Sequence, residues 1–541
     1  MRRRLKPFHP LEGAQAAASD PLVHAALSAS AGTGKTHVLT SRVLRLLLRG
    51  TPPQSILCLT FTKAGAAEMA NRIGERLAHW VRLPDADLAA ELNALGEEFG
   101  KCHLQDARRL FARVLEAPGG GLRIQTIHSF AQTLLAAFPA EAGIAPGFRP
   151  IEGRAEAELA RRTLANLLAN AETAGDEQLI GDVSALSLRL GEAGAEAYLM
   201  DCARAAEAMA ALGDRATIEG RLLDMIGIEG RVEECIARRL SDDEIDLGLI
   251  HRLIAANQAW ATETGRKIVS NLGEFLAVPA GRRREMLGMI GAGLVTAKGE
   301  PCKARAGQTQ AEPDYEHLSA EFADWLVGVR TLAASAELAK VQAAGLRAGQ
   351  AFASAYVAAK RAAGVADFDD LIAWTRRLFA REGMGEWVRY KLDQRTDHVL
   401  VDEAQDTNAD QWAIVDALAA EFFSGNPEAE DRWRTLFMVG DYKQAIFGFQ
   451  GTNPREYERF REKVRGQAGA RASAADEAEA RTREFRDLSI DASFRSAPAV
   501  LDVVDALIGD IGHAAMGLPA PPNPHQPYHV KRPGRVELWP A

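Results

Sequence analysis

Short apolar runs alternate with helical patterns at the start of the chain. The run 22–29 is mostly apolar and has the length of a buried strand, and apolar residues then recur at helical spacing over 38–47 until Gly50 ends the pattern. A second apolar run, 55–62, precedes the helical pattern of 63–77. Strands that alternate with helices in this way predict a parallel sheet flanked by helices, which is an α/β fold.

The pattern changes in the middle of the chain and then returns. Over roughly 155–360, alanine-rich and charge-studded segments carry very few strand signals, which predicts a largely helical insertion. Strand-like runs reappear at 398–406 and 435–441, so we expect the interrupted sheet to resume there. The polar stretch 465–484 is typical of a surface linker or a frayed helix, and the run "LSIDASFRS" beyond it predicts another strand.

The turn between the first predicted strand and helix carries "SAGTGKT", a near match to the phosphate-binding pattern G-x-x-x-x-G-K-[ST]. Its glycines let backbone N–H groups approach a phosphate, its lysine can reach the β- and γ-phosphates, and its threonine offers a hydroxyl to Mg²⁺. Ala29 replaces the first glycine of the pattern, but at a strand end its methyl group need not meet the phosphate. The alternative is a glycine-rich turn before an ordinary helix, which the Lys-Thr pair disfavours. The residues expected to bind nucleotide here are Ser30, Ala31, Gly32, Thr33, Gly34, Lys35, Thr36 and His37.

Two carboxylates follow a later apolar run. The strand predicted at 399–401 delivers Asp402 and Glu403 at its end, the edge of a parallel sheet where ligands collect. Asp402 would share Mg²⁺ with Thr36, and Glu403 would polarise the water that attacks the γ-phosphate. An Asp-Glu pair after an apolar run can instead be a helix N-cap, and the phosphate loop in the same chain favours the catalytic interpretation.

The segment "VGDYKQAIFGFQG" follows the strand predicted at 435–441. Gln444 can touch the γ-phosphate or the attacking water from there. Phe447 and Phe449 can offer a nucleic-acid base a stacking face if their loop is exposed. Core packing is the alternative for the two phenylalanines, and their spacing alone does not exclude it.

Composition bounds the class of protein without identifying a ligand. With 541 residues, of which 47% are hydrophobic and 25% charged, the chain is long enough for several domains and has no apolar run of bilayer length. The start "MRRRLKPFHP" has cations with no apolar stretch behind them, so we expect a cytoplasmic protein. The five cysteines are scattered without a C-x-x-C pair, which favours neither a metal cluster nor a disulfide framework. A net charge of −9 argues against bulk coating of nucleic acid and leaves room for a narrow strand groove.

The order of the motifs resembles that of the superfamily 1 UvrD/Rep/PcrA-like DNA helicases, and more closely that of the AddA-type subunit of bacterial AddAB helicase-nucleases. The similar segments are, in order, "ASAGTGKT", "TFTKAGAAEMANRI", "TIHSFAQTLLAAFPAEAG", "DFDDLI", "VDEAQDTNADQW", "VGDYKQAIFGFQG" and "SFRS". They cover both ends of the chain and leave the middle of the helical insertion unspecific. The resemblance implies a RecA-like P-loop NTPase fold with ATP and Mg²⁺ as cofactors, and members of the family tend to carry alanine at the position of Ala29.

The resemblance also assigns roles to individual residues. It implies that Gln15 reads adenine and that Phe494 stacks on the adenine ring. Arg495 would meet the γ-phosphate from a second lobe, and Arg72 would add a nucleotide contact. His128 looks like a contact to the DNA strand, although without the family context a core histidine is the simpler interpretation. The catalytic set is then Lys35, Glu403, Gln444 and Arg495, and the expected DNA contacts are Phe61, Thr62, Thr126, His128, Ser129, Phe447 and Phe449.

Several features depart from the family pattern. Gln450 and His37 stand where arginine is frequent, which can alter the coupling of hydrolysis to movement. We find no T-x-H-x-x-K-G-L-E-like segment, no later arginine-bearing motif and no nuclease domain, so we expect the N-terminal part of such a motor. The expected divisions are 1–150 and 361–464 for the first RecA-like lobe, 151–360 for the helical insertion, and 465–541 for a linker and the incomplete start of a second lobe.

The resemblance predicts an ATP-dependent helicase or translocase that moves 3′ to 5′ on single-stranded DNA in double-strand break repair by homologous recombination. The expected partners are DNA ends and an AddB-type subunit in a heterodimer. One alternative is a nucleotide-gated module that grips single-stranded DNA or a partner without productive unwinding. Another is an unrelated P-loop kinase or transporter ATPase, which DNA would not stimulate.

Overall fold

The structure of the chain is a computed structural model with two compact units. Unit 1 comprises Met1–Ile151 and Ala366–Ala541, and unit 2 comprises Glu152–Val365. The residues that the structure describes are 7–30, 32–97, 101–118, 121–228, 230–423, 433–441, 444–445, 451–472, 484–516 and 521–539.

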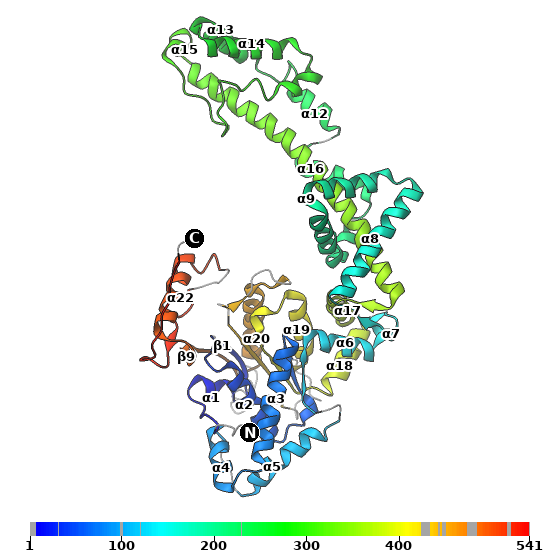
Figure 1. The fold of residues 1–541 in the computed structure, drawn as a ribbon, viewed down its shortest axis with the longest axis vertical. Helices are drawn as coiled ribbons and strands as arrows, with labels where there is room; N and C mark the ends of the chain where they lie inside the picture. Colours follow the sequence, from blue (N-terminus) through cyan, green and yellow to red (C-terminus); the bar gives the residue numbers. More distant parts are fainter. Residues whose placement is uncertain are drawn as a thin grey trace. The chain divides into compact units, whose positions relative to one another are not determined.

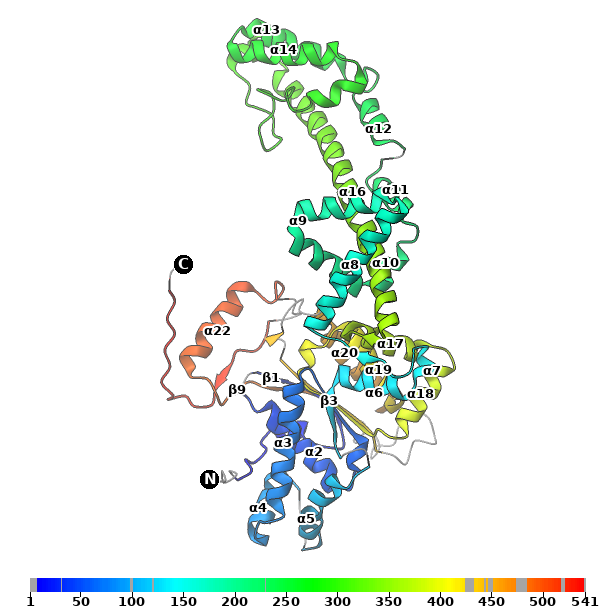
Figure 2. The same cartoon turned by 45° about the vertical axis from the view of Figure 1, so that its right-hand side comes forward.

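A six-stranded parallel sheet lies at the centre of unit 1 (Figures 1 and 2). Its strand order is β3-β2-β6-β7-β1-β8, and every neighbouring pair runs parallel. The carboxyl ends of all its strands therefore lie at one edge, where ligands bind in such sheets. The strands are β1 (His24–Ala29), β2 (Ile56–Thr60), β3 (Arg123–Thr126), β6 (His398–Val401), β7 (Thr435–Gly440) and β8 (Phe485–Ile490).

Helices cover both faces of this sheet. The first group, which packs on one face, is α1 (Ala14–Ala18), α2 (Lys35–Leu48), α3 (Lys63–Trp80), α4 (Asp85–Ala94) and α5 (Lys101–Leu115). The second group, on the other face, is α6 (Ile127–Ala137), α17 (Phe368–Ala380), α18 (Met384–Asp393), α19 (Ala409–Phe423) and α20 (Pro454–Ala472). The remaining elements of unit 1 are α7 (Pro139–Ala142), β4 (Arg149–Pro150), β9 (Ala492–Ser493), α22 (Pro498–Ile511), β10 (Gln526–Pro527) and the short 3-10 turns η1 (Pro53–Ser55) and η4 (Ala404–Asp406).

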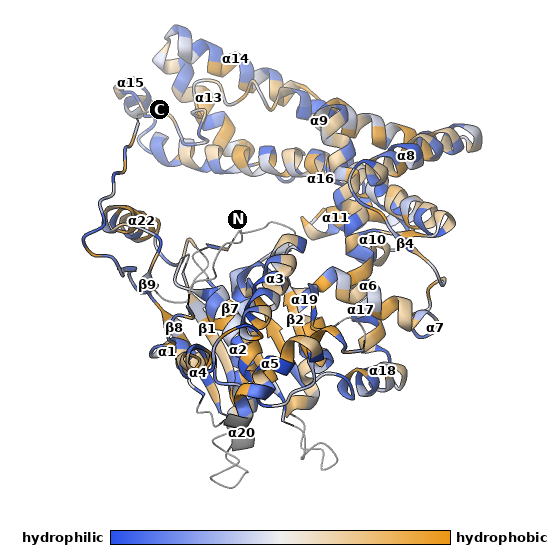
Figure 3. Ribbon diagram, turned by 60° about the horizontal axis from the view of Figure 1, so that its bottom comes forward, coloured by the Kyte–Doolittle hydropathy of each residue, from blue (hydrophilic) through white to orange (hydrophobic). Residues whose placement is uncertain are grey.

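Burial on both faces explains the continuous apolar runs of the strands. Leu57 and Leu59 of β2 belong to the core beneath the second helix group, whereas Ile56 and Cys58 belong to the core beneath the first. Successive side chains of a strand point to opposite faces, so a strand covered on both sides has to be apolar throughout. The central strands are accordingly coloured as largely hydrophobic in Figure 3. The predicted parallel sheet flanked by helices is thus confirmed.

Unit 2 is built from helices around one long helix, α16 (Tyr315–Ala363), which packs against α8 to α13 along its length. Arg347 of α16 forms a bidentate ion pair with Asp182 of α9, with both N···O distances 2.7 Å. The two-residue strand β5 (Val365–Ala366) follows α16. The elements that precede α16 in unit 2 are α8 (Arg154–Ala174), α9 (Glu177–Arg204), α10 (Ala206–Ala211), η2 (Arg215–Thr217), α11 (Ile218–Met225), α12 (Val232–Arg239), α13 (Leu247–Trp260), α14 (Glu263–Ala277), η3 (Ala280–Met286) and α15 (Ala306–Ala311).

The structure bears on two sequence expectations near the end of unit 1. Helix α20 continues to Ala472, so the stretch 465–484, expected to be a surface linker or a frayed helix, begins as a helix. Strand β8 pairs with β1 from His24↔Phe485 to Ala29↔Ile490 and belongs to the sheet of the first lobe. The start of a second lobe remains a prediction for the residues that follow β8.

A buried histidine in the sheet makes stability depend on pH. His398 at the start of β6 is 2% exposed and its Nδ1 lies 2.8 Å from Thr435 Oγ1. Burial, with smaller contributions from the charges of Arg42 and His24, lowers the pKa of His398 to about 3. The unfolded chain, with a histidine pKa of about 6.5, binds this proton more readily, so stability falls as the pH drops from about 6.5 towards 3.

We therefore expect urea unfolding of His398→Gln to depend less on pH than unfolding of the wild type. Between pH 7 and pH 5 the histidine should remove about 2 kcal/mol of stability, which the glutamine variant should not lose. Equal losses in the two proteins over this interval would show that His398 does not titrate in this way.

Within the described ranges, no helix is both long and apolar enough to cross a lipid bilayer.

Candidate nucleotide and nucleic-acid site

The predicted phosphate loop connects β1 to α2 at the carboxyl edge of the sheet. Gly32 and Gly34 have φ angles of 79° and 97°, a region that L side chains rarely adopt. The N–H and the hydroxyl of Thr33 both donate to Ser30 O, at 3.2 and 2.7 Å, and close the turn. Because α2 begins at Lys35, its free N–H groups and dipole point to where the phosphates of a nucleotide would lie.

Gly32 is also where the segment after β8 meets the phosphate loop. A Cβ atom built on Gly32 would lie 2.4 Å from Arg495 Cβ and 3.3 Å from Arg495 N. The neighbouring Phe494 N–H donates to Gly32 O at 3.0 Å. The absence of a side chain at Gly32 is therefore what lets Phe494 and Arg495 approach the loop.

We expect Gly32→Ala to weaken ATP binding by about tenfold or more, because it adds a steric clash with Arg495 to the strain of a positive φ. Gly50→Ala is the matched control, since Gly50 has a φ of 90° and open space where its Cβ would lie. Both variants should lose some thermal stability, whereas titration calorimetry should find weaker ATP binding in Gly32→Ala alone. Equal ATP affinities in the two variants would contradict this role of Gly32.

Lys35 brings the phosphate loop into contact with the strand-end carboxylates. Its Nζ lies 2.9 Å from Glu403 Oε2, and the two side chains are 11% and 40% exposed. Glu403 has a φ of 50°, which is uncommon for a residue with a side chain and typical of strained functional sites. Asp402 accepts from Glu403 N at 3.0 Å through Oδ1, and its own N–H donates to Leu59 O at 2.9 Å. These bonds fix the two carboxylates at the end of β6, where the sequence predicted them.

The two carboxylates have opposite protonation tendencies. Burial and the adjacent charge of Glu403 raise the pKa of Asp402 to about 6. Burial also opposes ionisation of Glu403, but the charge of Lys35 and hydrogen bonds from Gln405 and Lys35 outweigh it and lower the pKa of Glu403. The pair thus concentrates negative charge beside one lysine, an arrangement that a cation would stabilise.

Gln405 joins the two neighbouring strand ends, and the sequence analysis did not single it out. Its Nε2 donates to Glu403 Oε2 at 2.9 Å, and its Oε1 accepts from Asp441 N at 2.8 Å. Gln444, which we predicted to sense the γ-phosphate, donates through Nε2 to Asp441 Oδ2. Glu403 is therefore connected to the end of β7 through Gln405. The "DEAQD" segment was the available signal, but sequence alone does not tell which way this amide points.

Gln15 and Phe494 lie against the phosphate loop from two other elements. Gln15 of α1 donates through Nε2 to Thr33 O at 3.4 Å. The ring of Phe494 packs on Tyr528, with centroids 4.3 Å apart, and lies 6.5 Å from the ring of His9. The structure thus places each of the two residues that the resemblance assigns to adenine against the loop that it assigns to phosphate.

His37 and Arg72 have other contacts. The His37 ring packs on Phe8, with centroids 4.6 Å apart, and its Nε2 lies 3.0 Å from His9 O. Burial is the main cause of its lowered pKa. Arg72 forms an ion pair with Glu68 one helical turn away and is half exposed. Roles for these two residues in nucleotide binding stay predictions.

The predicted DNA contacts of the first lobe lie at the ends of two paired strands. Thr62 caps α3 by accepting from Gly65 N at 2.9 Å, and Thr126 caps α6 by accepting from Ser129 N at 3.1 Å. Their strands β2 and β3 are neighbours, paired at Thr60↔Thr126. Phe61 and Thr62 directly follow the residue that pairs with Thr126, and a shared role of these residues in binding a DNA strand stays a prediction.

An aromatic side chain that the sequence analysis did not assign lies beside these residues. The rings of His128 and Phe368 have centroids 4.9 Å apart, and Lys63 Nζ lies 5.9 Å from the centroid of Phe368. Burial lowers the pKa of His128, which keeps its imidazole neutral at physiological pH. Phe368 belongs to the "DFDDLI" segment, so the signal was present, but only the fold shows that it meets His128. Ala31, Phe447, Phe449 and Gln450 lie outside the described residues.

Comparison with known proteins identifies the family of this fold. The family model described as the UvrD/REP helicase N-terminal domain matches residues 12–465. Similar curated proteins are named as subunits of an ATP-dependent helicase/nuclease. That of Pelotomaculum thermopropionicum is 28% identical over 554 residues, covering 94% of this chain and 38% of the relative. That of Geobacillus thermodenitrificans is 26% identical over 537 residues, covering 91% and 38%. That of Carboxydothermus hydrogenoformans is 25% identical over 470 residues, covering 80% and 36%. The chain thus spans less than two-fifths of the length of these relatives.

Proposed function

Because the chain belongs to the UvrD/REP helicase N-terminal domain family, we propose that it binds and hydrolyses ATP with Mg²⁺ and drives movement along single-stranded DNA. The observation that carries this proposal is the 2.9 Å contact between Lys35 of the phosphate loop and Glu403 at the end of β6. It joins a triphosphate-binding element to a carboxylate that can activate water, and these are the two parts that phosphoryl transfer to water needs.

The residues at this edge fit a hard cation. Asp402 and Thr36 offer carboxylate and hydroxyl oxygens, the ligands that Mg²⁺ prefers. Burial and the charge of Glu403 raise the pKa of Asp402, and a cation bound beside it would favour its ionised form. A bound Mg²⁺ ion would supply charge neutralisation on the β- and γ-phosphates.

Lys35 is the residue whose contacts change when a nucleotide binds. The γ-phosphate attracts Lys35 away from Glu403, since it carries more negative charge than one carboxylate. Glu403 then keeps its hydrogen bond from Gln405 but loses the charge that lowers its pKa, and becomes a better proton acceptor. Water attacks the γ-phosphorus, its proton passes to Glu403, and the bond to the β-γ bridging oxygen breaks to release ADP and phosphate.

Gln444 and Arg495 would detect whether the γ-phosphate is present. The residues that contact the DNA strand would respond to that state. Gln444 is linked to Glu403 through Asp441 and Gln405, and Arg495 packs on Gly32. Closing and opening of the protein around ATP would move DNA past the aromatic and threonine contacts at the ends of β2 and β3. Phosphate and stacking contacts of this kind hold a strand without reading its sequence.

For the whole protein we propose 3′ to 5′ movement in double-strand break repair by homologous recombination. The relatives' names describe helicase/nuclease subunits, which supports a heterodimer with an AddB-type subunit that acts at DNA ends. A cytoplasmic location accords with this role.

Displacement of streptavidin from biotinylated single strands tests the movement. A 3′ to 5′ motor displaces streptavidin from the 5′ end faster than spontaneous release and leaves a 3′-end block in place, and it does so only with ATP and Mg²⁺. Faster release from the 3′ end would reverse the proposed direction. No ATP-dependent release from either end would contradict movement by this chain.

A further inference from the structure

Helix α1, which carries Gln15, is too short to hold its own orientation. It spans five residues, Ala14–Ala18, and its N-cap Gly13 provides no side-chain hydrogen bond. Helices of this length are unstable alone, because nucleation fixes several residues for each hydrogen bond gained. The direction in which Gln15 points must therefore come from contacts with the rest of unit 1.

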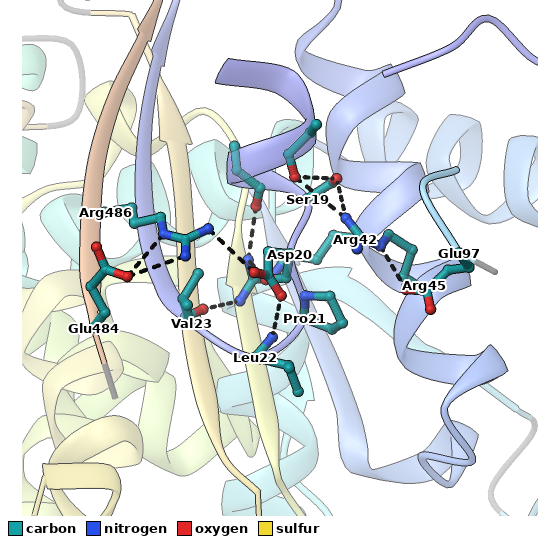
Figure 4. A network of polar contacts seen from close by, with 12 residues as sticks. Ser19, Asp20, Pro21, Leu22, Val23, Arg42, Arg45, Glu97, Glu484 and Arg486 are labelled. Carbon is teal, nitrogen blue, oxygen red and sulfur yellow. Dashed lines mark hydrogen bonds and ion pairs between the residues drawn. The ribbon is translucent and has the colours of Figure 1, made fainter. Parts of the chain in front are cut away.

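Part of that support comes from Arg42 on the phosphate-loop helix α2. Arg42 is 0% exposed and donates through Nη1 to Ala18 O at 2.8 Å and Asp20 O at 2.6 Å, and through Nη2 to Val23 O (Figure 4). Its guanidinium also lies 5.0 Å from the centroid of the Phe437 ring. One buried side chain thus binds three carbonyls of the segment that joins α1 to β1.

Arg45, one turn further along α2, binds the same segment. It donates to Ser19 Oγ at 2.9 Å and to Ala16 O at 3.3 Å, and its Nε donates to Glu97 Oε1 at 2.9 Å. Arg486 of β8 adds a hydrogen bond to Asp20 Oδ2 at 3.2 Å from the strand that leads to Phe494 (Figure 4). The carbonyls at the end of α1 are therefore held by the same helix that begins with Lys35.

We infer that Arg42 and Arg45 are positioning residues for recognition of the nucleotide base. They fix α1 to α2, so that the side chain of Gln15 and the phosphate loop form one rigid body with a set distance between base and phosphate. This inference rests on the proposed function and on the role in reading adenine that the family resemblance implies for Gln15. It adds that base preference, and not phosphate affinity, depends on two arginines of α2 that lie two to three turns beyond Lys35.

Calorimetric titrations of the full chain with ATP, inosine triphosphate and tripolyphosphate test this inference. Inosine lacks the 6-amino group of adenine, and tripolyphosphate has no base. We expect the wild type to prefer ATP to inosine triphosphate by about tenfold, the value of one well-made polar contact. Arg42→Met should lose most of that preference, as Gln15→Ala does, while its affinity for tripolyphosphate stays within about twofold of the wild type. The double variant Gln15→Ala/Arg42→Met should prefer ATP to inosine triphosphate at least as strongly as Gln15→Ala alone, because both changes act on one contact.

Arg434→Met is a matched control for the loss of a buried guanidinium. The Arg434 side chain is 6% exposed, pairs with Asp393 at the end of α18 and lies 6.0 Å from the centroid of the Phe422 ring of α19. It should lose thermal stability and keep the wild-type base preference. Arg45→Ala and Ser19→Ala remove weaker contacts to the same segment, so they test the inference if Arg42→Met does not fold, and each should lower the preference by a smaller factor.

The outcomes are distinct. An unchanged preference in Arg42→Met and Arg45→Ala, or an equal loss of affinity for all three ligands, would overturn the positioning role. A wild type that binds all three ligands equally would overturn it as well but leave the phosphate site intact. A wild type that binds none of them would overturn both this inference and the proposed function.

Discussion

Replacement of Glu403 by glutamine should lower the rate of ATP hydrolysis about 10²–10⁴-fold, the usual contribution of a positioned general base. The glutamine keeps the size of the side chain and can still accept from Gln405, but it cannot take a proton from water. ATP affinity should stay the same or rise slightly, because the variant removes a negative charge next to the triphosphate and frees Lys35 from its 2.9 Å ion pair. Single-turnover hydrolysis and equilibrium binding of ATP separate the two effects.

Glu75→Gln is the control for this variant, since Glu75 is an exposed residue of α3. It should hydrolyse ATP at the wild-type rate. Hydrolysis by Glu403→Gln within about tenfold of that rate would assign the general base to another residue.

Replacement of Lys35 by alanine should weaken ATP binding about 100-fold, which corresponds to about 2.8 kcal/mol. The variant loses a charge-assisted contact to the phosphates at the start of α2. It also loses the positive charge that lowers the pKa of Glu403, so this pKa should rise towards its ordinary value or above it. Calorimetric titration with ATP measures the first effect, and carboxyl NMR titration of the nucleotide-free variant measures the second.

Lys340→Ala provides the comparison, because Lys340 belongs to unit 2 and pairs with Glu233 and Glu337. It should bind ATP as the wild type does. Wild-type ATP affinity in Lys35→Ala would mean that the loop between β1 and α2 does not hold the triphosphate.

The parts of the site that the sequence predicted are those set by local rules. The apolar run before the glycines predicts β1. The glycines themselves predict a turn, and a helix is expected to begin after it at Lys35 and Thr36. The apolar residues before Asp402 predict β6 and place both carboxylates at its end. Because parallel strands share their carboxyl edge, the meeting of Lys35 and Glu403 across 368 positions of sequence was also predictable.

The rest depended on tertiary contacts that local patterns do not encode. Strand β3 has only four residues, Arg123–Thr126, three of them partly exposed, so it lacks the apolar run that reveals the other strands. Strand β8 is partly exposed as well, and only its pairing with β1 assigns it to this sheet. The contacts of Gln405, Phe368 and Arg42 each join segments whose proximity comes from the order of strands, which the sequence leaves open.

The most direct test of the proposed function is the rate of ATP hydrolysis with and without single-stranded DNA, measured for the wild type and for Glu403→Gln. We expect hydrolysis by the wild type that single-stranded DNA accelerates, and loss of hydrolysis under both conditions in the variant. A rate that DNA does not change, or hydrolysis that survives in Glu403→Gln, would contradict a DNA-coupled ATPase centred on Glu403.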